Sequence, residues 1–181
     1  MFLGRWGATD DEVAGPVTGD DLCPGARLVA TRCITVGAPP DAVFPWLRQM
    51  GIGRAGWYSH DILDNLGRRS ARRILPEWQG LTAGDTVPGG PVGFEAVVVE
   101  PPKSFVLRLG TRERPSRRVC FVLAYELRAH GGGTRIVTRV RARVNLPGGR
   151  LVERLVLGPG DGVMLRRQLL GLRKRTGRPD E

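Results

Sequence analysis

The stretch from Trp57 to Asp61 (WYSHD) holds the densest group of side chains able to do chemistry. Adjacent residues on a helix diverge by about 100°, so His60 and Asp61 do not form a dyad by themselves. Tyr58 and Asp61 are three residues apart and share a face if the stretch is helical. Asp61 can then act as an acid or base on an enolisable ligand, with Tyr58 and His60 as further candidates for proton transfer. In the alternative interpretation, Trp57 and Tyr58 pack one end of the fold and Asp61 pairs with a nearby arginine.

The other side chains of catalytic or metal-ligating type form no familiar set. His60 and His130 are the only histidines, and His130 lies in a glycine-rich turn. The cysteines are odd in number and lack C-x-x-C spacing, which favours reduced, mostly buried thiols at Cys23, Cys33 and Cys120. We therefore expect neither a metal ion nor a cofactor.

Hydrophobic periodicity predicts a strand and two helices around this stretch. Residues 28–36 (LVATRCITV) are rich in β-branched side chains and indicate a strand. A helix begins at residues 39–41 (PPD), where a missing amide hydrogen costs little, and carries an apolar stripe of Val43, Trp46, Leu47 and Met50. Residues 57–66 suit a second, short helix that ends at Gly67.

From residue 94 onward the pattern changes to the two-residue period of strands. The predicted strands are 94–100, 104–109, 119–127 and 134–144, with a hairpin turn at 130–133. The last strand alternates between apolar and basic residues, which predicts a solvated face lined by Arg135, Arg139, Arg141 and Arg143. A final helix over 161–176 has an apolar stripe of Leu165, Leu169 and Leu172. This order of elements predicts an α+β fold.

The length of 181 residues suits a single domain. We divide it into an N-terminal extension (1–27), a core (28–176) and a tail (177–181). Thr9 and Glu12 in the extension have the spacing of a capping box, which predicts a short helical turn. No apolar run has the length of a membrane span and no signal-peptide core is present, so we expect a cytoplasmic protein.

The net charge of +10 comes almost entirely from arginine, because Lys103 and Lys174 are the only lysines. This bias reflects either a GC-rich genome or a polyanionic partner. The basic residues are dispersed without an aromatic-plus-basic motif, so nucleic acid is not an expected partner. The basic stretch 166–178 can touch the phosphates of an anionic membrane, or it can simply be a solvated helix face.

Two motifs carry a resemblance to a known family. Residues 38–51 (APPDAVFPWLRQMG) and 56–59 (GWYS) resemble the SRPBCC superfamily, also called START-like or polyketide-cyclase-like, in its uncharacterised actinobacterial-type branch. The resemblance implies a helix-grip fold, in which a curved antiparallel sheet wraps around a long C-terminal helix and two short helices follow the first strand. It also implies a deep apolar cavity between sheet and helix for lipids, sterols, polyketides or similar molecules.

Residues on the inward faces of the predicted elements are the candidates for ligand binding. Such cavities have apolar walls and a few polar groups that orient the ligand. The candidates are Trp57, Tyr58, Asp61, Phe94, Tyr125, Thr138, Met164 and Gln168. Plain core packing is the alternative for Met164, and a hydrogen bond to the sheet or surface exposure for Gln168.

Three hypotheses for function follow. The first is binding of a small hydrophobic molecule in an internal cavity. The second is a polyketide cyclase or aromatase that uses Tyr58, His60 or Asp61 for proton transfer. The third is a binding module whose arginine-rich surface recruits an anionic partner. If Phe94, Phe105, Phe121 and their neighbours fill the space between sheet and helix, both cavity hypotheses fail.

Overall fold

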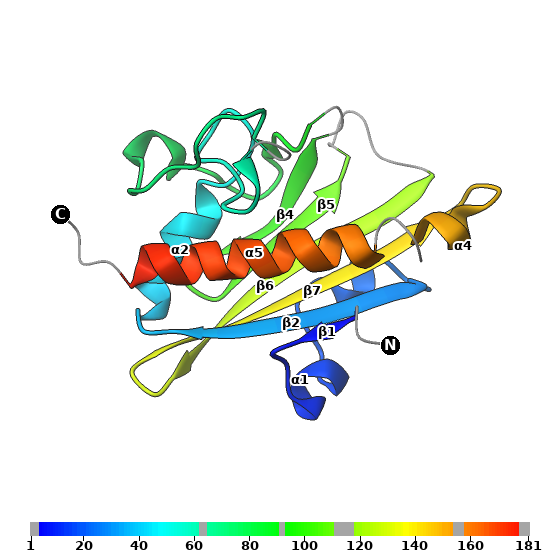
Figure 1. Cartoon of the computed structure of the whole chain (residues 1–181), viewed down its shortest axis with the longest axis horizontal. Coiled ribbons are helices and arrows are strands. Elements are labelled where there is room, and N and C mark those ends of the chain that lie inside the picture. The colour runs from blue at the N-terminus through cyan, green and yellow to red at the C-terminus, as the bar shows by residue number, and fades with distance from the viewer. Residues whose placement is uncertain (1–3, 62–64, 91–92, 111–117, 154–157, 178–181) are drawn as a thin grey trace.

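The computed structural model describes residues 4–61, 65–90, 93–110, 118–153 and 158–177, and it has the predicted α+β class (Figure 1). One seven-stranded sheet has the order β1-β2-β7-β6-β5-β4-β3. Its strands are β1 (Arg5–Trp6), β2 (Leu28–Val36), β3 (Thr86–Val87), β4 (Phe94–Glu100), β5 (Ser104–Leu109), β6 (Val119–His130) and β7 (Gly133–Val144). The helices are α1 (Asp10–Ala14), α2 (Pro40–Arg48), α4 (Gly149–Val152) and α5 (Gly158–Thr176), with 3-10 turns η1 (Asp20–Leu22) and η2 (Pro76–Trp78).

The five longer strands were predicted from their own residue patterns, whereas the two-residue strands β1 and β3 were not predicted. The bounds of β2, β4 and β5 are those expected, and β6 continues three residues further, to His130. Gly131 and Gly132 both have positive φ and make the tight turn into β7. The sheet is mixed, not wholly antiparallel as expected, because β1 in the N-terminal extension pairs in parallel with β2.

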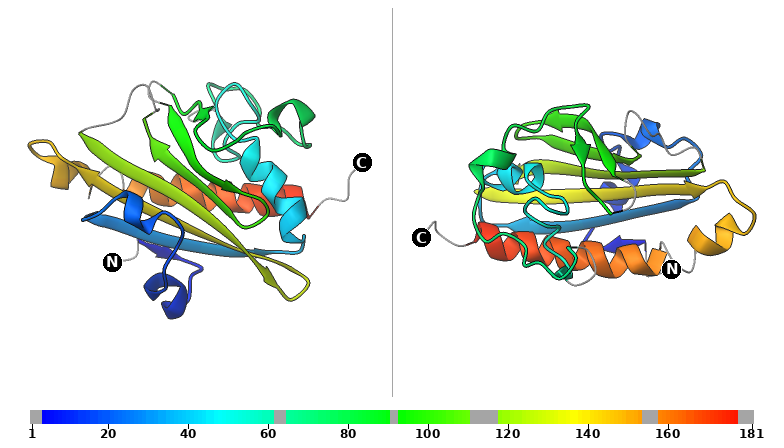
Figure 2. Two further views of the ribbon diagram at one scale, coloured as in Figure 1. Left: turned by 180° about the vertical axis from the view of Figure 1, so that it is seen from behind. Right: turned by 90° about the horizontal axis from the view of Figure 1, so that it is seen from above.

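Helices α2 and α5 lie on one face of the sheet, and α1 lies on the other (Figure 2). The apolar stripe of α2 is buried as predicted at Val43, Trp46, Leu47 and Met50. Leu165, Leu169 and Leu172 of α5 are buried in the same core cluster as Phe105, Leu107, Tyr125 and Ile136. This arrangement is compatible with a helix-grip fold. No helix in the described part of the chain is both long and apolar enough to cross a membrane.

The predicted helix over 57–66 is wrong for its first turn. Residues 57–60 form no helix, and Tyr58 has a φ of 62°. A residue in this left-handed region cannot continue a right-handed helix, so the chain changes direction there. Asp61 is helical, and residues 62–64 of the predicted helix lie outside the described residues.

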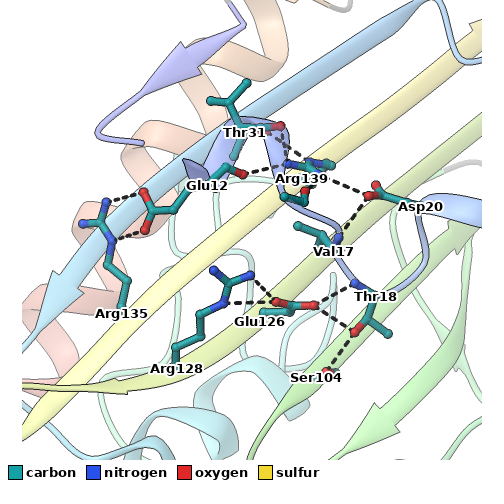
Figure 3. Close-up of polar contacts among 12 residues, drawn as sticks. Glu12, Val17, Thr18, Asp20, Thr31, Ser104, Glu126, Arg128, Arg135 and Arg139 are labelled. Carbon is teal, nitrogen blue, oxygen red and sulfur yellow. Dashed lines mark hydrogen bonds and ion pairs between the residues drawn. The ribbon is translucent and has the colours of Figure 1, made fainter. Parts of the chain in front are cut away.

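The predicted solvated face of β7 is also wrong, because the N-terminal extension covers it (Figure 3). Arg139 is only 4% exposed and donates to the carbonyl oxygens of Glu12, Val13 and Gly15. Its guanidinium also bonds Asp20 and Thr31. The predicted capping box between Thr9 and Glu12 is present and begins α1. Arg139 therefore binds the extension to the sheet. It donates to carbonyl groups near the end of α1 that have no partner within the helix.

All three cysteines lie in a small apolar cluster on this outer side of the sheet. The structure pairs Cys23 with Cys120 as a disulfide, so the prediction of three reduced thiols is correct only for Cys33. Burial raises the pKa of the Cys33 thiol to about 12, which keeps it protonated at neutral pH.

Candidate functional site

A pocket of about 500 Å³ opens between the segment after Trp57 and helix α5. This volume lies within the range of small-molecule sites. Among the described residues, its walls carry five cations and one carboxylate. We call it the basic pocket; it is lined by Tyr58, Ser59, Asp61, Arg69, Ser70, Arg72, Arg167, Leu170, Gly171, Lys174 and Arg175.

Helix α5 supplies one wall. Arg167 and Lys174 are seven residues apart, or about two turns, so they lie on the same side of the helix with Leu170 between them. Gly171 allows the helix to approach the opposite wall closely. A Cβ atom at this position would lie 2.2 Å from the carbonyl oxygen of Tyr58, a contact that no side chain can make.

Tyr58 forms a fixed part of the opposite wall. Its hydroxyl donates to the carbonyl oxygen of Trp46 at 3.0 Å and accepts from Nε2 of Gln49 at 2.9 Å. Burial raises the pKa of the Tyr58 phenol above its usual range. The phenol therefore stays protonated at neutral pH and is not suited to act as a base.

Asp61 is held by Ser70, not by the arginine that the packing alternative expected. Its Oδ1 accepts from the Ser70 amide at 3.1 Å and from the Ser70 hydroxyl at 2.5 Å. The Ser70 hydroxyl oxygen also accepts from the amide of Tyr58 at 3.2 Å. Ser70 thus ties together the two candidates Tyr58 and Asp61, as well as the loop that carries Arg69 and Arg72.

Arg175 connects this loop to α5. Its Nε donates to the carbonyl oxygen of Ala71 at 2.8 Å, and Nη1 donates to that of Gly171 at 3.1 Å. The guanidinium lies 4.6 Å from the centre of the Tyr58 ring, within cation–π range. Arg175 is therefore a positioned cation, whereas Arg69 and Arg72 are exposed at the rim.

A second pocket of about 480 Å³ lies next to the first along α5. Arg167 and Leu170 line both pockets. The other residues of this second pocket are Arg5, Trp6, Arg32, His60, Gly162, Val163 and Arg166. His60 lines the second pocket and Asp61 the first, so these neighbours face different spaces, as the sequence indicated for a pair that forms no dyad.

The polar candidates for an internal cavity are bonded to the protein itself. The Tyr125 hydroxyl bonds Oε1 of Gln168 at 2.5 Å, and Nε2 of Gln168 lies 3.5 Å from the Met50 sulfur. The Thr138 hydroxyl donates to the carbonyl oxygen of Arg32. Tyr125, Gln168 and Thr138 are all buried, and they line neither pocket described above.

The remaining candidates also lie outside these two pockets. Trp57 is buried and packs edge-on against Phe94, with ring centres 5.6 Å apart. Phe94 in turn contacts the ring of Phe121. Met164 is partly exposed on α5. Among the described residues, no group of three or more His, Cys, Asp or Glu side chains could hold a metal ion.

Sequence reasoning missed the cations that surround Asp61. The run from Arg68 to Arg73 was a basic loop in the sequence, and Arg167 and Lys174 belonged to a basic terminal stretch. Nothing in the sequence of either segment indicates that the two segments lie side by side in the fold. The available signal was the local density of positive charge in both segments, which a shared anionic ligand would explain.

Comparisons with known proteins support the fold. No protein-family model and no curated protein matches the sequence. Among solved structures, protein MLL2253 of Mesorhizobium loti has a TM-score of 0.53 at 14% identity, over 84% of this chain and 99% of its own. A protein from Rhodobacter sphaeroides also has a TM-score of 0.53, at 11% identity, over 92% of this chain and 99% of its own. The Aha1 dimer of Colwellia psychrerythraea has 0.51 at 15% identity, over 81% of this chain and 93% of its own. At these identities the likeness concerns the fold alone.

Proposed function

We propose that this protein binds a small organic anion, a carboxylate or a phosphate, in the basic pocket. The observation that carries the proposal is that the described residues place five cations and one carboxylate around a space of small-molecule size. That carboxylate, Asp61, already accepts two hydrogen bonds from Ser70. Like charges brought together in this way repel one another, and a bound anion relieves the repulsion.

The partners of these cations support the proposal. Within the described ranges, no ion pair involves Arg69, Arg72, Arg167 or Lys174. Guanidinium groups offer paired N–H donors that match the two oxygens of a carboxylate or phosphate. The neighbouring Leu170 and Tyr58 ring supply apolar surface for the rest of the ligand. The pocket therefore suits an acid with an apolar body better than a free inorganic ion.

Titration with inorganic phosphate, followed by calorimetry and amide chemical shifts, tests this site. The double variant Arg69→Ala/Arg72→Ala removes two charge-assisted contacts, each worth about 1.5–3 kcal/mol, and we expect at least a tenfold loss of affinity. Arg68→Ala/Arg73→Ala is the matched control, because it changes the net charge equally in the same loop but touches residues outside the pocket lining. Equal losses in both variants would mean a diffuse charge effect and no site.

The predicted hydrophobic ligand between sheet and α5 is a second candidate. A ligand there would replace the buried bond between Tyr125 and Gln168, which joins β6 to α5. Native mass spectrometry of protein from its own host, with organic extraction, tests it. A stoichiometric neutral lipid or polyketide whose retention is reduced by Tyr125→Phe supports this candidate. Its absence from protein that binds phosphate leaves the basic pocket as the function.

A further inference from the structure

We infer that the ligand is an aromatic acid, an aryl carboxylate or aryl phosphate, whose acid group lies in the basic pocket and whose ring lies in the second pocket. This inference rests on the proposed function and names its ligand class. The two pockets share Arg167 and Leu170, and the consecutive residues Ser59 and His60 line one pocket each. A molecule that fills one pocket therefore reaches the other without leaving the surface of α5.

Apolar surface in the second pocket favours a ring. Trp6 of β1 and Leu170 of α5 contribute to its walls, and Val163 beside them is 61% exposed. An exposed valine on a helix needs no explanation when it is isolated. Here Val163 and the indole ring of Trp6 line the same pocket, and a flat apolar group of a ligand would cover both side chains.

The cations of this pocket suit an aromatic group more than a second acid. The guanidinium of Arg166 lies 5.4 Å from the centre of the Trp6 ring, and such planar cations stack readily on aromatic faces. Arg5 is already paired with Asp10 and donates to the carbonyl oxygen of Ala8. Arg5 is thus already paired, whereas Arg69 and Arg72 have no partner among the described ion pairs, so we place the acid group in the basic pocket.

Arg32 brings a buried cation to the wall of the second pocket. It lies on the inward face of β2 between the core residues Ala30 and Ile34, is 1% exposed, and still forms part of the second pocket. A guanidinium offers five N–H donors and no acceptor. Because Arg32 already interacts with another group of the protein, no group of the ligand is assigned to it.

Three probes separate the contributions: inorganic phosphate, 2-naphthyl phosphate and 2-naphthol. We expect naphthyl phosphate to bind at least tenfold more tightly than either of the others. Val163→Ser should weaken naphthyl phosphate binding about threefold, and Trp6→Ala about tenfold, because both remove ring contacts. Both variants should leave the affinity for inorganic phosphate within about twofold of the wild type. Val29→Ser is the matched control, since Val29 is exposed on β2 but lines neither pocket.

The outcomes distinguish this inference from the proposed function. Equal affinities for phosphate and naphthyl phosphate, with Val163→Ser silent, overturn the aromatic extension and leave the anion site intact. Naphthol binding as tightly as naphthyl phosphate overturns the anion site itself. Amide shifts at Gly162 and Val163 with naphthyl phosphate, but not with inorganic phosphate, are the positional result expected. If Trp6→Ala fails to fold, Val163→Ser alone still decides between these results.

Discussion

Arginine serves two different purposes on the two sides of this molecule. On the outer face of the sheet, Arg139 donates to three carbonyl oxygens, a carboxylate and a hydroxyl, and is almost fully buried (Figure 3). In the basic pocket on the α5 side, Arg69 and Arg72 are exposed. Among the described ion pairs they have no partner. An overall charge of +10 thus combines cations that hold the chain together with exposed cations that we propose bind a ligand.

The difference lies in what each guanidinium meets. The N-terminal extension brings Glu12 and Asp20 to the outer arginines, along with the carbonyl groups at the end of α1. A buried charge is tolerated when it is paired and fully hydrogen-bonded. The α5 side instead brings other arginines and a lysine together, and Arg69, Arg72, Arg167 and Lys174 have no partner among the described ion pairs. The exposure of each cation and the groups it pairs with therefore distinguish structural cations from candidate ligand-binding cations. Amino-acid composition alone cannot make this distinction.

The largest expected effect comes from removing an outer cation. Arg139→Ala leaves the carbonyl groups of Glu12, Val13 and Gly15 without their donor and Asp20 without its closest partner. We expect a loss of about 3–5 kcal/mol in the free energy of unfolding, measured by urea denaturation. Arg69→Ala is the counterpart on the other side and should change it by less than about 0.5 kcal/mol. Similar losses for both variants would abolish the distinction between the two sides.

The pH dependence of stability tests the structural role of the outer arginines, because Glu12 pairs with Arg135. Its hydrogen bond from Arg135 lowers the pKa of the Glu12 carboxyl from 4.5 to about 2. Because the folded pKa is below the unfolded one, the stabilisation is fully present above pH 4.5 and is lost as the pH falls towards 2. Glu12→Gln should cost about 2–3 kcal/mol at pH 7 and flatten the stability profile across this window.

Asp10→Asn is the control for that experiment, because Asp10 is nearly fully exposed in its pair with Arg5. Surface pairs contribute little, so its profile should follow that of the wild type. A Glu12→Gln profile that stays parallel to the wild type down to pH 2 would mean that the outer ion pair does not stabilise the extension.

Tyr125→Phe examines the interior that separates the two sides. It removes the hydroxyl bonded to Gln168 and leaves a buried amide oxygen without this partner, at a cost of about 1–2 kcal/mol. Thermal unfolding measures the loss. The variant should bind inorganic phosphate as the wild type does, because Tyr125 does not line the basic pocket. A weaker affinity for phosphate would instead connect the interior with the pocket.

The sequence predicted what depends on neighbouring residues and missed what depends on distant ones. Strands β2, β4 and β5 and the stripe of α2 follow from local periodicity. The covering of Arg139 does not, because alternation distinguishes the two faces of a strand but cannot say whether another segment packs on the second face. The left-handed conformation of Tyr58 was missed because the contacts that hold it come from Trp46, Gln49 and Ser70.

The basic pocket was only partly predictable for the same reason. Tyr58 and Asp61 were singled out by side-chain type, and both line it. Arg72 and Arg167 are about a hundred residues apart in the chain, and only the packing of α5 against the loop brings them together. The predicted ligand contacts of Tyr125, Thr138 and Gln168 stay predictions, tied to the interior candidate.

The smallest effect, and the one that bears on catalysis, is expected from Asp61→Asn. Asn keeps an oxygen to accept from Ser70 but removes the carboxylate that Asp61 contributes to the described part of the pocket wall. Removing a like charge beside a bound anion is worth about 0.5–1 kcal/mol near the surface, so affinity for inorganic phosphate should rise about threefold in calorimetry. Ser59→Ala, in the same wall, controls for the altered surface. If Asp61 is instead the acid or base of a cyclase-type reaction, Asp61→Asn abolishes turnover of an enolisable substrate without strengthening anion binding. Tighter phosphate binding by Asp61→Asn would therefore mean that Asp61 only repels the bound anion. Lost turnover would mean that Asp61 is a catalytic residue.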